Sequence, residues 1–131
     1  MFCPLLPGIA DDPEAIQQLV EFALQCGVEE VFVEPVNGRG PGLKATEAAL
    51  REAGFAREAE AIAEIRSKEG WSAYVTALLN NVQQVLRRFG ALEKLRFLLY
   101  PSRLTPRDER WIREHGQGVK WLGKDHTPDT Q

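Results

Sequence analysis

Cysteine, histidine and long apolar runs are all scarce in this chain of 131 residues, and each shortage argues against particular classes of function. The two cysteines, Cys3 and Cys26, lie far apart, which favours reduced and largely buried thiols over a disulfide or a metal centre. The two histidines, His115 and His126, have no cysteine or carboxylate at metal-ligand spacing, so we interpret both as structural or solvent-facing. No apolar run reaches a membrane span of roughly 18 residues, and the N-terminus has no signal-peptide pattern. A cytoplasmic protein without a membrane partner is expected.

Three common catalytic motifs are also missing. The spacing of Gly38, Gly40 and Gly42 matches neither the dinucleotide fingerprint nor a P-loop, which ends in Gly-Lys-Ser/Thr. No nucleophile elbow is present. These absences argue against nicotinamide-dependent, nucleotide-hydrolysing and serine-hydrolase chemistry.

The composition present is that of one globular domain, with 44% hydrophobic and 27% charged residues. The net charge of −3 is unevenly spread, because residues 84–124 carry ten basic and four acidic side chains, whereas residues 1–83 are acidic. Such asymmetry can mark an anionic partner such as nucleic acid. The basic residues are interspersed with Asp108, Glu109 and Glu114, which favours solvated helix faces instead.

Hydrophobic periodicity and breaker residues predict an alternation of strands and helices. Strands are expected at 2–7, 28–36, 94–100 and 118–124, and helices at 13–26, 44–53, 56–68, 71–89 and 105–116. A strand, a helix and a strand at the N-terminal spacing form a βαβ unit with parallel strands. The predicted fold class is therefore α/β, with about four mostly parallel strands and flanking helices over residues 1–125, followed by a disordered tail at 126–131.

Two local patterns support these helices. Six apolar positions line one face of residues 71–89, namely Val75, Leu78, Leu79, Val82, Leu86 and Phe89, and Gln83 lies on the opposite face. Thr105, Pro106 and Asp108 predict a capping box, in which the carboxylate of Asp108 reaches back to the start of the helix.

A ligand site is expected where the parallel strands end. The strands at 2–7, 28–36 and 94–100 are followed by Pro7-Gly8-Ile9, by Glu34 to Asn37 and by Tyr100 to Arg103. The glycine-rich loop 37–44 allows close backbone approach, and Arg39 within it could hold a carboxylate or a phosphate. A plain long turn is the competing interpretation of this loop.

Several stretches resemble a known family. The segments "CPLLPGIADDPEAIQQLVEFALQCGVEEVFVEPVN", "KLRFLLYPSRLTPRD" and "VKWLGK" resemble the C-terminal half of radical SAM enzymes, in particular proteins similar to spore photoproduct lyase. The likeness covers residues 2–124. It implies the C-terminal part of a partial (β/α) barrel. "PLLPGIADDPEA" would correspond to the fifth barrel strand with its loop, and "VFVEPVNGRG" to the sixth strand.

The resemblance also implies a cofactor site. In that family these strand ends contact S-adenosylmethionine, and the positions that correspond here are Leu6, Gly8, Glu34, Val36 and Asn37. Arg39 and Arg103 are the expected substrate-binding residues, and no catalytic or metal-ligating residue is expected in this chain. The intact parent would cleave S-adenosylmethionine at a [4Fe–4S] cluster to form a 5′-deoxyadenosyl radical, with nucleic acid as one candidate target.

The chain departs from the family at the cluster. Three cysteines spaced C-x3-C-x2-C hold the family's cluster, and this chain has only two distant cysteines and lacks the glycine-glycine-glutamate motif. We therefore expect a cluster-less C-terminal portion, inactive alone, whose partner is the missing N-terminal half of the barrel. Self-association through an exposed strand edge at 2–7 or 94–100 is expected in its absence. The alternative is a non-catalytic α/β module that binds a small anion or a protein.

Overall fold

The computed structural model describes residues 12–37 and 41–123 of the chain. These residues form five α-helices and a three-stranded parallel sheet, so the α/β class is confirmed. The strands β1 (Val31–Val33), β2 (Leu95–Leu99) and β3 (Val119–Trp121) lie side by side in that order. The strand predicted at 2–7 and the tail at 126–131 lie outside the described residues.

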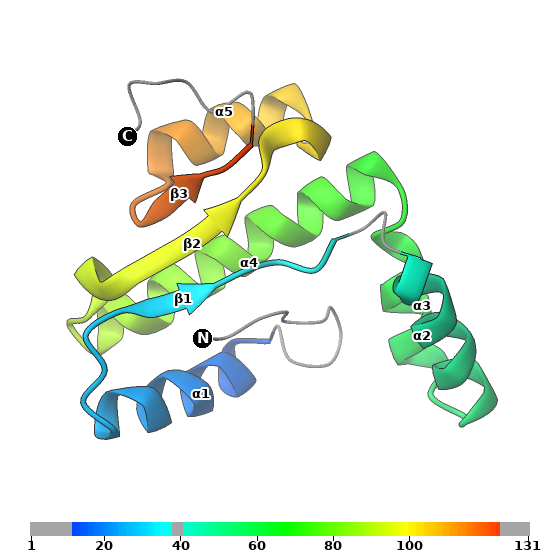
Figure 1. Ribbon diagram of the computed structural model, residues 1–131, viewed down its shortest axis with the longest axis horizontal. Helices are drawn as coiled ribbons and strands as arrows, with labels where there is room; N and C mark the ends of the chain where they lie inside the picture. The colour runs from blue at the N-terminus through cyan, green and yellow to red at the C-terminus, as the bar shows by residue number, and fades with distance from the viewer. Residues whose placement is uncertain (1–11, 38–40, 124–131) are drawn as a thin grey trace.

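Each strand is preceded by a helix (Figure 1). Helix α1 (Pro13–Gln25) leads to β1, α4 (Lys68–Arg88) leads to β2 through the short 3₁₀ helix η1 (Leu92–Lys94), and α5 (Pro106–His115) leads to β3. A second 3₁₀ helix, η2 (Pro101–Arg103), follows β2. Helices α2 (Pro41–Glu52) and α3 (Ala56–Glu64) pack against each other as a hairpin beyond the carboxyl end of β1 (Figure 1).

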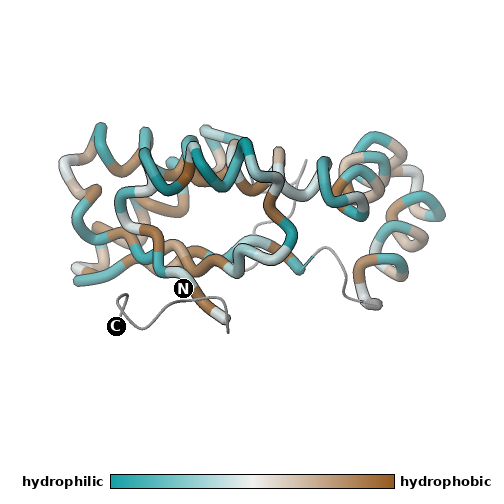
Figure 2. Tube along the Cα trace, turned by 90° about the horizontal axis from the view of Figure 1, so that it is seen from above, coloured by the Kyte–Doolittle hydropathy of each residue, from teal (hydrophilic) through white to brown (hydrophobic). Residues whose placement is uncertain are grey.

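The sheet and the helices form two layers. Figure 2 shows the strands on one side and α1, α4 and α5 on the other, with the α2–α3 hairpin beyond the end of both layers. Along the strands, the side chains at Val31, Val33, Leu95, Phe97 and Leu99 are buried, and those between them are half-buried. The buried set therefore packs against the helices, while the alternate positions form the opposite surface of the sheet. We call this surface the open face; it carries Phe32, Arg96, Leu98, Tyr100 and Lys120.

The central position of β2 corrects one expectation. Residues 94–100 were expected to offer a free strand edge for self-association, but β2 pairs with β1 on one side and with β3 on the other. Its backbone N–H and C=O groups are engaged in two ladders, so it has no edge to offer another chain.

The end of the third helix and the start of the fourth, both predicted from the position of Gly70, were also wrong. Helix α3 ends at Glu64 rather than at 68, and α4 begins at Lys68, where Ser67 caps it by accepting a hydrogen bond from Gly70 N at 3.0 Å. Gly70 lies inside α4. The residue there is a glycine because a side chain would collide with the backbone carbonyl of Glu64. The glycine serves a close approach rather than a helix end. The glycine-rich segment 37–44 is not all loop either, since α2 begins at Pro41, a favoured first position.

Helix α4 holds the core together, largely as its apolar pattern predicts. Five of its six predicted positions are buried, whereas Phe89 at its C-cap is 38% exposed. Gln83 is buried, contrary to prediction, and its Nε2 donates hydrogen bonds of 2.9 Å to the carbonyl oxygens of His115 and Gln117. These carbonyls follow the last turn of α5 and need donors, and Gln83 supplies them.

The predicted capping box at α5 is half correct. The hydroxyl of Thr105 accepts from Asp108 N at 3.3 Å, as a cap does. The carboxylate of Asp108 does not reach back to Thr105 N. Instead, Ser72 Oγ on α4 donates to Asp108 at 2.6 Å and accepts from Thr105 N at 3.0 Å. A buried serine of another helix thus occupies the place between the two capping groups.

Candidate functional site

A pocket of about 300 Å³ opens where β1 and β2 end. Nine residues line it: Glu34, Pro35, Val36, Asn37, Trp71, Leu98, Tyr100, Ser102 and Arg103. Four of them follow β1, four belong to or follow β2, and Trp71 comes from the first turn of α4. The carboxyl ends of neighbouring parallel strands meet at one edge of the sheet, which is the usual ligand position in α/β proteins.

Extension of the strand register by one residue beyond β1 places Glu34 beside Leu98, and both line the pocket. Val33 pairs with Phe97, and both are fully buried against the helices. Glu34 and Leu98 come next on their strands, so both side chains point to the open face. Tyr100, two residues further along, lies on the same face and is 53% exposed. A carboxylate, an aliphatic side chain and a phenol are thereby adjacent at the pocket.

The backbone after β1 is held by two aromatic side chains of α4. Trp71 Nε1 donates a hydrogen bond of 2.7 Å to Val36 O, and Val36 N donates one of 3.1 Å to the hydroxyl of Tyr74. Trp71 and Tyr74 lie three residues apart and therefore on one side of the helix. Both polar backbone groups of Val36 are satisfied by side chains, so this wall of the pocket is fixed without strand pairing.

Arg103 closes another part of the pocket. Its Nη2 donates a hydrogen bond of 3.0 Å to Arg66 O, and its Cζ lies 6.0 Å from the ring centroid of Trp71. The guanidinium thus links the end of β2 to the segment between α3 and α4. Glu34, by contrast, has neither a hydrogen bond nor an ion pair with any residue in the described ranges 12–37 and 41–123.

The pocket unites four of the site residues predicted from the sequence, namely Glu34, Val36, Asn37 and Arg103. The other three, Leu6, Gly8 and Arg39, lie outside the described residues. Sequence reasoning missed Trp71, Tyr74 and Leu98, whereas Tyr100 was expected at a strand end of the site but was not assigned a binding role. An available signal was the pair of aromatic residues three positions apart at the start of an otherwise aliphatic helix.

No cluster of three or more histidine, cysteine or carboxylate side chains suited to a metal occurs among the described residues. Cys26, the C-cap of α1, is a free and exposed thiol, which corrects the expectation that it is buried. It follows the last buried position of α1, Ala23, and so lies beyond the apolar stripe. His115 stacks on Trp111 and lies at the C-terminus of α5, a structural role as expected.

The basic C-terminal third is paired in part with acidic groups. Arg113 lies 3.0 Å from Glu109 and Arg96 lies 3.0 Å from Glu30. Arg113 also stacks over Trp121, with 4.2 Å between its Cζ and the ring centroid. In the part of the chain that the structure describes, no helix combines the length and the apolar character needed to cross a membrane.

Comparison with family models, curated proteins and solved structures gave no match to this chain. The pocket geometry therefore carries the functional argument.

Proposed function

We propose that this chain is the C-terminal portion of a radical SAM-type (β/α) barrel and that its pocket binds the adenosyl part of S-adenosylmethionine. The observation that carries the proposal is the convergence of Glu34, Val36 and Asn37 in one cavity with the apolar side chains of Leu98 and Tyr100. Ligand sites of such barrels lie at the carboxyl ends of the strands, where this cavity is found.

The dimensions and lining of the pocket suit a nucleoside. A volume of about 300 Å³ lies at the lower end of small-molecule pockets, which are mostly apolar with a few polar groups that orient the ligand. Val36, Leu98 and Tyr100 offer apolar surface to a planar base. Asn37 and Glu34 offer hydrogen-bonding groups at the rim.

The sheet is compatible with a partial barrel. Parallel sheets usually have both faces covered, and their strands are then apolar throughout. Here α1, α4 and α5 lie on one side, and the open face mixes Phe32 and Leu98 with Arg96 and Lys120 (Figure 2). A surface of this mixed composition is suited to line a ligand cavity in a partial barrel.

In the proposed parent, S-adenosylmethionine supplies a 5′-deoxyadenosyl radical when a reduced [4Fe–4S] cluster donates an electron. The described residues do not form a site for that cluster, so the role proposed for this chain is limited to binding. Its residues hold the base, keep water from the apolar wall and form part of the substrate cavity. Arg103 at the rim would face the substrate, for which nucleic acid is one candidate.

A titration tests the proposal. Adenosine added to the ¹⁵N-labelled chain should shift the amides of Val36 and Asn37 and the indole N–H of Trp71 before any others. Because the other half of the cofactor site is missing, we expect a Kd on the order of 1 mM, about −4 kcal/mol. Absence of shifts at this pocket at 10 mM adenosine would reject the proposal.

The alternative is a non-catalytic module that binds a small anion, and the guanidinium of Arg103 in the pocket favours it as second candidate. Inorganic phosphate is the discriminating probe. Saturable shifts with phosphate and none with adenosine would support the anion module.

An iron–sulfur reconstitution assay tests the second part of the proposal, namely that this chain binds the ligand but holds no cluster. Anaerobic reconstitution with iron and sulfide should leave this chain without a stoichiometric cluster, because two distant cysteines cannot replace three that converge. Stoichiometric iron and sulfide together with release of 5′-deoxyadenosine would contradict the role given to this chain.

A further inference from the structure

We propose that Glu34 recognises the ribose of the bound nucleoside, its carboxylate accepting hydrogen bonds from the 2′- and 3′-hydroxyls. The inference rests on the proposed function and deepens it, because it assigns a role to one side chain of the pocket.

The first argument is that this carboxylate lines the pocket without a partner among the described residues. Glu34 is half-buried at the end of β1, yet no described residue donates a hydrogen bond to it or pairs with it. The half-buried Glu47 and Glu109 pair with arginines, whereas Glu58 is half-buried and unpaired among the described residues but does not line the pocket. An ionised carboxylate has about four acceptor positions, and a partly desolvated one needs donors.

The second argument is the charge already present. Arg103 lines the same pocket, and an arginine guanidinium is always protonated. The sulfonium and ammonium groups of S-adenosylmethionine are positively charged, whereas its ribose is neutral and can lie beside Glu34 without adding a like charge to this cavity. A neutral diol supplies two donors to the carboxylate and adds no charge. The interaction of an acidic side chain with ribose hydroxyls is also the one used in dinucleotide-binding folds.

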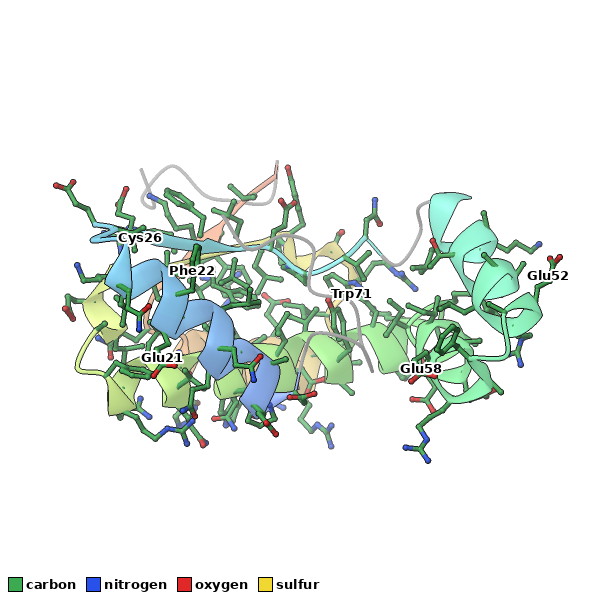
Figure 3. The ribbon with its side chains drawn as sticks, turned by 90° about the horizontal axis from the view of Figure 1, so that it is seen from below. Glu21, Phe22, Cys26, Glu52, Glu58 and Trp71 are labelled. Carbon is green, nitrogen blue, oxygen red and sulfur yellow. The ribbon has the colours of Figure 1, made fainter. Side chains whose placement is uncertain are left out.

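The third argument is the geometry of the wall. Glu34 stands beside Leu98 when the strand register is extended by one residue, with Tyr100 further along the same face. Figure 3 shows Trp71 between α4 and the segment that follows β1. A base packed against the apolar side chains would therefore have its sugar within reach of a carboxylate on the neighbouring strand.

The test compares two ligands and four chains. Adenosine and 2′,3′-dideoxyadenosine are titrated by NMR into the wild-type chain and into the variants Glu34→Ala, Glu34→Gln and Glu29→Ala. Glu29 is exposed and lies outside the pocket, so it is the matched control. The amide spectrum of each variant reports whether its fold is retained.

For the wild-type chain and the control, we expect dideoxyadenosine to bind about tenfold more weakly than adenosine, because charge-assisted hydrogen bonds are lost. Glu34→Ala should bind both ligands equally weakly, so that the two losses are not additive. Glu34→Gln, which keeps one acceptor and the size of the side chain, should be intermediate.

The outcomes separate this inference from the proposed function. If the wild-type chain binds both ligands with equal affinity, or if Glu34→Ala weakens both by the same factor, the ribose assignment is wrong while the nucleoside pocket stands. If adenosine does not bind the wild-type chain, the proposed function fails and the assignment fails with it. Where Glu34→Ala does not fold, Glu34→Gln decides the assignment, because a folded Glu34→Gln chain with the full tenfold preference for adenosine would contradict it.

Discussion

At the residue scale, the hydrogen bonds of the Val36 backbone fix one wall of the pocket. The chain leaves the sheet after Val33, and the N–H and C=O of Val36 would need water or a ligand if no side chain were near them. Tyr74 and Trp71 provide partners for both. The position of Val36 in the pocket thus depends on two side chains of a helix that begins some thirty residues later in the sequence.

Replacing Trp71 should show this dependence. In Trp71→Phe the donor to Val36 O is lost, and a partly buried carbonyl without a partner costs about 1–3 kcal/mol. Urea unfolding should record that loss, and the amide shifts of Val36 and Asn37 should change most. The control is Trp111→Phe, since the indole N–H of Trp111 has no hydrogen-bond partner among the described residues. Equal losses in the two variants would contradict the role of the Trp71 hydrogen bond.

At the scale of the helices, the contact between α4 and α5 depends on the buried hydroxyl of Ser72. Ser72 is fully buried and stands between Thr105 N and the carboxylate of Asp108, which is 6% exposed. Removing the hydroxyl leaves Thr105 N without its acceptor and takes from the Asp108 carboxylate its shortest hydrogen bond, so that this buried group keeps the 3.4 Å contact with the exposed Arg107.

Ser72→Ala should therefore destabilise the chain by about 1–3 kcal/mol, more than the loss of an exposed hydroxyl. Thr46→Ala on α2 is the control, because its hydroxyl bonds only to Gly42 O on an exposed helix, and a change within about 0.5 kcal/mol is expected there. Chemical denaturation of both variants supplies the comparison. Indistinguishable midpoints would show that water replaces the serine at no cost.

Ion pairs connect α2 with α3 and with the segment that follows α3, so the hairpin should respond to acid. Hydrogen bonds from Arg51 and then from Arg66 hold the pKa of the Glu47 carboxyl below its ordinary value of 4.5, although desolvation opposes them. A lowered carboxyl pKa contributes stability that is present above the unfolded-state pKa and is lost as the pH falls through the folded-state pKa.

We expect the amide signals of α2 and α3 to lose dispersion below about pH 4.5 in the wild-type chain. Glu47→Gln should already show the weakened hairpin at neutral pH and little further change on acidification. Glu52→Gln, at the exposed end of α2, should behave as the wild type. An acid response in Glu47→Gln equal to that of the wild type would refute the assignment.

Periodicity and turn chemistry made the elements predictable, whereas contacts between elements did not. The apolar stripe of α4 and the alternation in β2 were readable because burial on one side leaves a period in the sequence. The roles of Gly70 and Gln83 were misinterpreted, because each depends on a group of another segment. Gly70 lies against the carbonyl of Glu64, and Gln83 donates to the carbonyls of His115 and Gln117. Likewise, Glu34, Val36, Asn37 and Arg103 could be predicted from strand ends, and Trp71 could not.

At the scale of the whole molecule, the open face is the surface on which we expect self-association. Phe32 and Leu98 lie on it, half-buried, beside Arg96 and Lys120, while α1, α4 and α5 lie on the other side of the sheet. Apolar side chains at this density on one surface favour association. With β2 central, we propose that any self-association uses this face instead of the edge of β2.

Sedimentation velocity from 10 µM to about 1 mM tests this proposal. We expect the wild-type chain to associate in that range and Phe32→Lys to shift association to higher concentration. Phe22→Lys is a strict control, because Phe22 is 67% exposed on α1, away from the sheet. Association that Phe22→Lys abolishes and Phe32→Lys leaves intact would place the contact on α1, and a monomer at all concentrations would reject the proposal.

The order of the strands also has a kinetic consequence. The connection from β1 to β2 is about three times longer than that from β2 to β3, because it includes the α2–α3 hairpin as well as α4. Closing the longer loop costs about 1 kcal/mol more of chain entropy. During refolding, β2, α5 and β3 should therefore assemble against α4 first, and β1 should dock last. Substitutions in β1 should then accelerate unfolding while leaving the refolding rate nearly unchanged.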